Sequence, residues 1–410
     1  GDVNGDGWPD VVIGLDADVV WVNLSTGNGQ AFSPELAYND VVHHPSLVDM
    51  ELADVDQDGD LDIFMLAAYQ TDQSVELKLQ VLDWTGDWYS LMVSSFLEIE
   101  WDKFAYFDCD MSVIDIDSNG FPDVVYTHTG NGFADREYMV YLQVDPFTGG
   151  ANLVWQSDGQ PFVSHVVADI DQDDDEDLLA YYTGSGYYRV TYDNGLLNSS
   201  PMLLDTVLTG RSLSVGDLNG DGPADLLTYG RDNAFSFGSE HIFNRPGPLV
   251  SNPSPPFLLT RATNFLRDIQ PWDWDADGQA DVLFCDDTGI AWLRNEGGGQ
   301  SYSPPATVWV APFLLSHFEF AQLDGDGLPD GVGATQVSNI GQLPVIWQSS
   351  GDPLTFPEFE LRHGWDFDVA DADGDGDQDV ALLTRESGVV LLWNNGVSFT
   401  PQVVIPDNFN

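Results

Sequence analysis

The sequence predicts an all-β repeat fold, and within that class a β-propeller of four-stranded blades. Three observations predict it. An Asp-rich segment of nine residues returns eight times along the chain. Apolar, often β-branched runs flank these segments, as strands beside a tight turn do. No segment combines a 3.6-residue apolar period with helix caps, so little helix is expected. Four short strands in a repeat of roughly 50 residues are typical of a propeller blade.

The repeated segment has the form DxDxDGxxD. Its copies start at Asp2, Asp54, Asp115, Asp169, Asp217, Asp273, Gln322 and Asp371. Successive starts are separated by 52, 61, 54, 48, 56, 49 and 49 residues. Because this spacing is nearly regular over the whole chain, we expect residues 1–410 to form a single propeller domain. The first copy begins at the second residue, so we also expect that this domain is part of a longer chain.

Each copy is surrounded by similar segments. A partly apolar segment such as 46–52 precedes the loop, and an apolar run such as 63–66 or 282–284 follows it. A third strand ends in an aromatic residue and a polar turn, as at 292–295, and a fourth strand such as 399–405 completes the unit. We therefore expect the loop to join the first two strands of each blade.

The number of blades depends on the first copy. Every loop is followed by three strands, but only seven loops have a strand before them. We favour eight blades, with one inner strand missing upstream, because a loose three-stranded unit would leave exposed edges. The alternative is a ring of seven complete blades that follows a partial unit.

The composition excludes several classes of protein. Asp and Glu total 68 against 12 Lys and Arg, which gives a formal charge of -56. Such a chain repels nucleic acids and anionic membranes and attracts cations. A hydrophobic content of 43% is sufficient for a packed core. The two cysteines, Cys109 and Cys285, make neither a disulfide framework nor a zinc site, and a bridge between them is not expected.

The loop suits calcium. Calcium takes about six to eight oxygen ligands, and carboxylates at positions one, three, five and nine surround one point. Position seven adds its main-chain carbonyl, and Gly at position six allows the sharp turn. Asn4, Asn119 and Asn219 keep an oxygen while removing a charge. The loops have no His or Cys at ligand spacing, which argues against zinc and copper. Magnesium is disfavoured because it loses its water reluctantly.

The candidate calcium ligands occupy positions one, three, five, seven and nine of the copies. They are Asp2, Asn4, Asp6, Trp8, Asp10, Asp54, Asp56, Asp58, Asp60, Asp62, Asp115, Asp117, Asn119, Phe121, Asp123, Asp169, Asp171, Asp173, Asp175, Asp177, Asp217, Asn219, Asp221, Pro223, Asp225, Asp273, Asp275, Asp277, Gln279, Asp281, Asp324, Asp326, Leu328, Asp330, Asp371, Asp373, Asp375, Asp377 and Asp379. Two copies depart from the pattern. Gln322 replaces the first Asp of the seventh copy, and Asp174 replaces the Gly of the fourth. We expect up to eight calcium ions, with a weaker or empty seventh site and a reshaped fourth turn.

The sequence resembles the FG-GAP/VCBS repeat family, whose calcium loops have this form. The resemblance extends beyond the loops to stretches such as 21–32, 292–302 and 393–399. Helix-flanked calcium loops are a poorer match, because a strand-like run follows the ninth residue here. The resemblance implies an integrin-α-like propeller with calcium loops between the first and second strands. It also implies an extracellular or cell-surface location.

Three functions are weighed. The first is a non-enzymatic adhesion or assembly module that binds protein or glycan at the cell surface, with calcium in a structural role. The second is a carbohydrate-binding propeller similar to fungal lectins of this repeat type. Its candidate sugar platforms are Tyr181, Tyr182, Tyr187, Tyr188, Trp84 and Trp88, although aromatic residues more often fill the space between blades. The third is a polysaccharide lyase similar to some rhamnogalacturonan lyases. Only His43 and His44 form a local basic pair, which is more simply a surface turn, and no catalytic residue is assigned.

Overall fold

The computed structural model is all-β. It describes residues 1–15, 19–25, 27, 31–40, 46–70, 75–85, 89–99, 108–116, 119–129, 138–145, 150–156, 162–168, 177–182, 186–193, 196–198, 209–222, 225–231, 240–245, 257–262, 266–337, 341–349, 353–361, 367–396 and 398–405. Within these residues every regular element is a β-strand and none is a helix. The predicted all-β class is therefore confirmed.

The chain divides into two compact units. The first consists of Gly1–Val167 and Asp174–Met202, and the second of Ala168–Asp173 and Leu203–Asn410. The prediction of one propeller domain over residues 1–410 stays a prediction.

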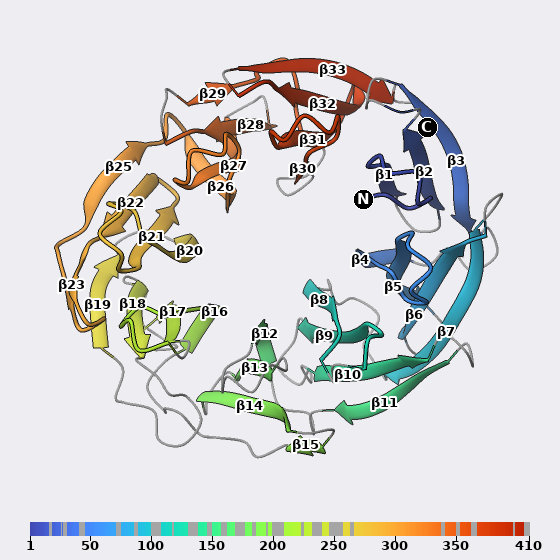
Figure 1. Cartoon of the computed structure of the whole chain (residues 1–410), viewed down its shortest axis with the longest axis horizontal. Helices are drawn as coiled ribbons and strands as arrows, with labels where there is room; N and C mark the ends of the chain where they lie inside the picture. The colour runs from blue at the N-terminus through green and yellow to red at the C-terminus, as the bar shows by residue number, and fades with distance from the viewer. Residues whose placement is uncertain are drawn as a thin grey trace. The chain divides into compact units, whose positions relative to one another are not determined.

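Four sheets form the first unit, and each is an antiparallel meander in chain order (Figure 1). The first sheet contains β1 (Val11–Leu15), β2 (Val19–Ser25) and β3 (Phe32–Asn39). The second contains β4 (Ser46–Ala53), β5 (Asp62–Gln70), β6 (Val75–Trp84) and β7 (Tyr89–Ile99). The third contains β8 (Asp108–Ile114), β9 (Asp123–Thr129), β10 (Tyr138–Asp145) and β11 (Gly150–Gln156). The fourth contains β12 (Phe162–Ala168), β13 (Asp177–Tyr182), β14 (Gly186–Asp193) and β15 (Leu196–Asn198).

The second unit repeats the same plan. The fifth sheet contains β16 (Thr209–Gly216), β17 (Asp225–Arg231), β18 (Glu240–Arg245) and β19 (Phe257–Ala262). The sixth contains β20 (Leu266–Trp272), β21 (Asp281–Asp286), β22 (Gly289–Leu293) and β25 (Ala306–Val310), with a hairpin of β23 (Asn295–Gly297) and β24 (Ser301–Tyr302) before its last strand. The seventh contains β26 (Leu314–Ala321), β27 (Asp330–Val337), β28 (Gly341–Trp347) and β29 (Leu354–Thr355). The eighth contains β30 (Phe367–Ala370), β31 (Asp379–Thr384), β32 (Gly388–Asn394) and β33 (Phe399–Ile405).

The Asp-rich loops occupy the predicted place in these sheets. Residues 54–62 join β4 to β5, and residues 273–281 join β20 to β21, so the loop connects the first two strands. The first sheet has three strands within the described residues, because its loop at 2–10 leads directly into β1. This agrees with the predicted absence of one first strand, while the number of blades stays a prediction.

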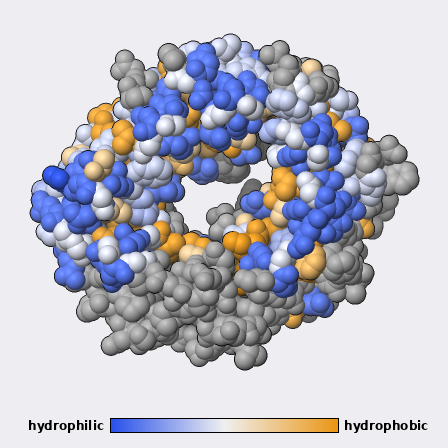
Figure 2. Space-filling model, in the orientation of Figure 1, coloured by the Kyte–Doolittle hydropathy of each residue, from blue (hydrophilic) through white to orange (hydrophobic). Residues whose placement is uncertain are grey.

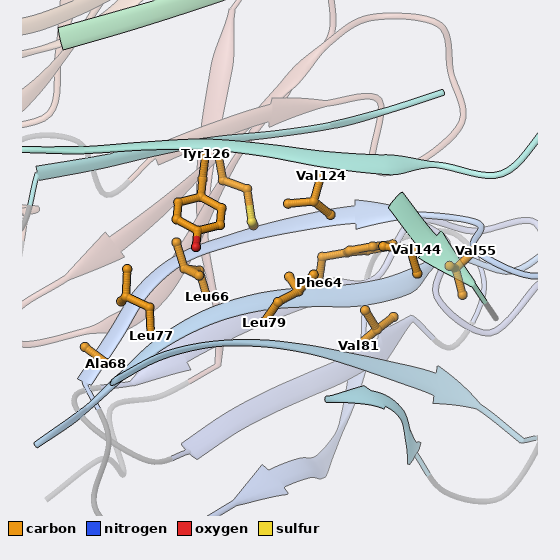
Figure 3. Close-up of a cluster of buried hydrophobic side chains, with 11 residues drawn as sticks. Val55, Phe64, Leu66, Ala68, Leu77, Leu79, Val81, Val124, Tyr126 and Val144 are labelled. Atoms are coloured by element: carbon orange, nitrogen blue, oxygen red, sulfur yellow. The ribbon is translucent and has the colours of Figure 1, made fainter. Parts of the chain in front are cut away.

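The second strand of a sheet is buried on both faces. In β5, Phe64 and Leu66 belong to a cluster with Tyr126 of β9 (Figure 3). Ile63 and Met65 of the same strand belong to another cluster, with Val20 and Val22 of β2. Successive strand residues face opposite sides, so neighbouring sheets cover both faces. This explains the continuous apolar runs that follow the loops in the sequence.

The second unit uses the same double burial. Val282 and Phe284 of β21 pack in a cluster with the fifth sheet, and Leu283 and Cys285 pack in a cluster with the seventh. Cys285 is a buried free thiol, as expected. By contrast, the described surface is largely hydrophilic in the view of Figure 2, in keeping with the acidic composition.

Carboxylates in the first strands connect successive sheets. Asp49 of β4 accepts a hydrogen bond from the Met111 amide of β8 at 2.9 Å. Asp268 of β20 accepts one from the Phe320 amide of β26 at 3.3 Å. Both residues lie at register shifts of the first strand, and such bulges turn a side chain away from the regular pleat.

Candidate metal centres

Backbone amides wrap around the side chains of each described loop. In the eighth loop, Asp371 Oδ1 accepts the Asp375 amide at 3.1 Å and Oδ2 accepts the Gly376 amide at 3.0 Å. Asp373 accepts the Asp375 amide at 3.2 Å, and Asp375 accepts the Asp377 amide at 2.9 Å. In five other loops the amide of position six likewise donates to the carboxylate of position one at 2.7–3.1 Å. The accepting residues are Asp2, Asp54, Asp115, Asp217 and Asp273. These bonds fix the carboxylates on the inside of the turn.

Two positions of the loop require a left-handed backbone. The predicted one is position six, where the described glycines have φ between +86° and +101°. The sequence did not lead us to predict a left-handed residue at position four. Its backbone is nevertheless left-handed, even where Gln57 (φ 63°) and Ala276 (φ 57°) occupy it. A sequence signal existed, because four copies carry glycine there. Two consecutive turns of this kind make the loop tight enough to surround one point.

Position nine is a buried framework residue. Asp379 is 1% exposed. Its Oδ1 accepts the Asn394 amide at 2.7 Å, and its Oδ2 accepts the Ala372 amide at 3.0 Å. Asp10, Asp281 and Asp330 accept the equivalent pairs of amides. The sequence assigned this residue to calcium alone, whereas the structure shows that it also ties the loop to the third strand.

A buried asparagine extends this connection to the preceding sheet. Asn394 Nδ2 donates to the Leu323 carbonyl of the seventh loop at 2.7 Å and to the Gln378 carbonyl of its own loop at 3.0 Å. Asn295 makes the corresponding bond to Leu218 of the fifth loop, also at 2.7 Å. Loop, third strand and neighbouring sheet therefore form one hydrogen-bonded network.

Carboxylates converge in three of the described loops. Each group has ligand atoms that all lie within 4.8 Å of one another: Asp54, Asp56 and Asp58; Asp273, Asp275 and Asp281; Asp371, Asp373 and Asp379. All donors are oxygens, which is the donor set that hard divalent cations prefer. These groups could hold a metal ion.

Burial makes the negative charge of the loop carboxylates unfavourable unless a cation is bound. Burial raises the pKa of Asp62 to about 8 and that of Asp379 to about 6. Burial, followed by the charge of Asp58, raises the pKa of Asp60 to about 7. Asp54 Oδ1 and Asp62 Oδ1 are also buried without a hydrogen-bond partner. A bound cation would satisfy these oxygens and favour the charged carboxylates, so the residues fit calcium.

The seventh loop carries Gln322 in place of the first aspartate. Gln322 Oε1 is buried and has no hydrogen-bond partner. Of the five loops described throughout, the first and the seventh do not gather three carboxylates as the second, sixth and eighth do. A weaker seventh site stays a prediction.

Several predicted residues lie outside the described part of the chain. They are Asp117, Asp169, Asp171, Asp173, Asp175, Pro223, His43, His44 and Trp88, together with Asp174 of the altered fourth turn. The same holds for the side chains of Asp177, Tyr181, Tyr182, Tyr187 and Tyr188. Trp84 is described and half-buried at the end of β6. The sugar-platform hypothesis is therefore neither supported nor contradicted by these aromatic residues.

Comparisons with known proteins identify the repeat. The model of the FG-GAP-like repeat matches residues 2–65 and 273–332. No curated protein matches the sequence. Among the described residues, no helix is long and apolar enough to cross a membrane.

Two solved structures share the fold at low sequence identity. A lectin of Agrocybe aegerita that recognises non-reducing terminal N-acetylglucosamine is 17% identical, with a TM-score of 0.50 over 99% of this chain and 92% of that chain. The Dos1 propeller is 8% identical, with a TM-score of 0.51 over 94% of each chain. At this identity the likeness concerns the fold alone, and it agrees with the predicted propeller.

Proposed function

Because the chain carries FG-GAP-like repeats, we propose that it is a calcium-stabilised β-propeller that acts as a binding module outside the cell. The observation that carries the proposal is the convergence of three carboxylates in each of three loops that occupy the same place in their sheets. Calcium at these loops is structural, because the buried ninth residue joins the loop to the third strand. Binding free energy at such a site adds to the stability of the fold.

The proposal includes eight blades. The eight successive sheets of the described residues support it, with the three-stranded first sheet counted as a blade. An experimental structure tests the number directly. Eight blades around one axis support the proposal, and seven contradict it.

The ligand class that we favour is a glycan. The Agrocybe lectin, whose fold spans 99% of this chain, supports this choice over a protein partner. Lectin sites in general place a few polar groups beside aromatic rings in a concave site. A metal-stabilised scaffold keeps such groups in position without itself touching the sugar.

A glycan array tests the proposed function. The full chain is applied with calcium and again after treatment with a chelator. Binding to defined glycans in calcium and its loss with the chelator are expected, because the scaffold loosens. Failure to bind any glycan while a cell-surface protein is captured would instead favour adhesion through protein contacts. Binding that survives complete removal of calcium would contradict the structural role of the metal.

A further inference from the structure

One position in the third strand carries opposite charges in two sheets. The residue after the ninth loop position pairs with the third strand, as Ile63 with Leu82 and Val282 with Leu293. The next residue of the third strand is Asp83 in the second sheet and Arg294 in the sixth. The repeat motif contains neither residue. The two sheets thus provide a natural comparison at one structural position.

In the second sheet this position completes an acidic group. Ligand atoms of Asp58, Asp60 and Asp83 all lie within 4.8 Å of one another. Asp60 stands at position seven of the loop, where the calcium motif uses only a carbonyl. Its side chain is 9% exposed, and its Oδ1 is buried without a hydrogen-bond partner. A buried, unpaired carboxylate oxygen between two other carboxylates is costly unless a cation joins it.

In the sixth sheet the same position supplies a cation of its own. Arg294 Nε lies 2.7 Å from Asp275, and Nη2 lies 3.3 Å from Asp277. Position seven is Gln279 in this loop, so the counterpart of Asp60 carries no charge. The guanidinium therefore balances part of the loop charge, and the sixth loop has no second group of three carboxylates among the described residues.

We propose that Asp58, Asp60 and Asp83 form a second divalent-cation site, which takes calcium, beside the calcium loop of residues 54–62. Asp58 belongs to both groups, because it also converges with Asp54 and Asp56. It bridges the two ions, as shared carboxylates do in paired metal sites. The inference rests on the proposed calcium binding of this loop, and it adds one ion that the nine-residue motif does not require.

The pairing is specific to the second copy. The fourth and eighth loops also have an acid at position seven, Asp175 and Asp377. In their sheets, however, the third-strand position is Thr191 and Trp393. The first loop has Trp8 and Leu24 at the two positions. A second site needs both acids, so we expect one extra ion per chain.

The test is the number of calcium ions bound per chain at saturation, measured by equilibrium dialysis and elemental analysis. Asp83→Asn should bind one ion fewer than the wild type. Glu358→Gln, which removes the same charge from an exposed turn, should bind the wild-type number. Far-UV circular dichroism checks that each variant is folded.

A gain of binding provides the second arm. The double variant Gln279→Asp, Arg294→Asp copies the two acids into the sixth sheet and should bind one ion more than the wild type. Unchanged stoichiometry in both Asp83→Asn and the double variant overturns the inference while leaving the calcium loops intact. A wild-type chain that binds no calcium overturns the proposed function together with it.

Discussion

Replacement of Asp379 by alanine tests the framework role of position nine. The carboxylate is 1% exposed and accepts two buried amides, from Ala372 at 3.0 Å and from Asn394 at 2.7 Å. Hydrogen bonds to a charged group contribute about 1.5–3 kcal/mol each, so the loss of both should cost about 3–6 kcal/mol. Such a cost is large for a single substitution, since most cost about 0.5–3 kcal/mol.

The control is Asp373→Ala in the same loop. Asp373 belongs to the same carboxylate group, but the one amide that it accepts, from Asp375, lies in an exposed turn. Its role is therefore mainly to hold the cation. With calcium present, both variants should be less stable than the wild type. After chelation, Asp379→Ala should keep most of its cost, whereas Asp373→Ala should approach the wild type or exceed it, because one repulsive charge is gone.

The assay is the free energy of unfolding from urea titration at neutral pH, with saturating calcium and with a chelator. A variant without a folded baseline in chelator has lost at least the whole stability of the metal-free wild type. The reasoning is refuted if Asp379→Ala costs less than about 1 kcal/mol in chelator, the net value of one ordinary hydrogen bond. Equal costs for the two variants in chelator would refute it as well.

Three further substitutions follow from the same structure. Asn394→Ala should cost about 2–4 kcal/mol, because two buried carbonyls lose their hydrogen-bond donor. Asn395→Ala at the neighbouring exposed site should cost under about 1 kcal/mol. Thermal melts of both variants measure the difference. Gly289→Ala should cost over about 2 kcal/mol, because its φ is +147° and the new Cβ would strike the carbonyl of residue 309. Gly278→Ala, with φ +88° and open surroundings, should cost about 1–2 kcal/mol from backbone strain alone. Urea unfolding of the two variants separates the cost of the contact from the cost of the strain. Burial lowers the pKa of His165 to about 4, so between pH 6.5 and 4 the unfolded chain binds a proton that the folded chain does not. As the pH falls through that window, the wild type should lose up to about 3 kcal/mol of unfolding free energy relative to His165→Gln. Parallel pH profiles of stability for the two proteins would contradict this.

The repeat made much of this architecture predictable. The period of the Asp-rich segment and the apolar runs beside it predicted all-β sheets with the loop between the first two strands. They also predicted the three-stranded first sheet. The sixth-position glycine was predicted because the sharp turn that it allows is part of the local geometry of the loop. These features follow from neighbours in the sequence, which periodicity reports directly.

The contacts made across the sheets were not predictable in the same way. Asp379 seemed to be a metal ligand only, since its amide partner at Asn394 lies 15 residues along the chain. The meeting of Asp60 with Asp83 likewise depends on the register of β5 and β6. Register is set by packing and turn geometry, so one sequence indicates which residues are acidic but not which acids meet.

The most direct test of calcium stabilisation is the melting temperature of the full chain in calcium and in chelator. A site filled at a hundredfold excess over its dissociation constant stabilises the folded state by about 2.7 kcal/mol, and several sites act together. Melting should therefore shift down by roughly 10 °C or more when calcium is removed from several sites, because each kcal/mol shifts the midpoint of a chain of this length by about 1 °C. It should recover when calcium is restored, whereas magnesium should restore little. An unchanged melting curve in chelator would contradict the claim that these loops hold the fold together through bound calcium.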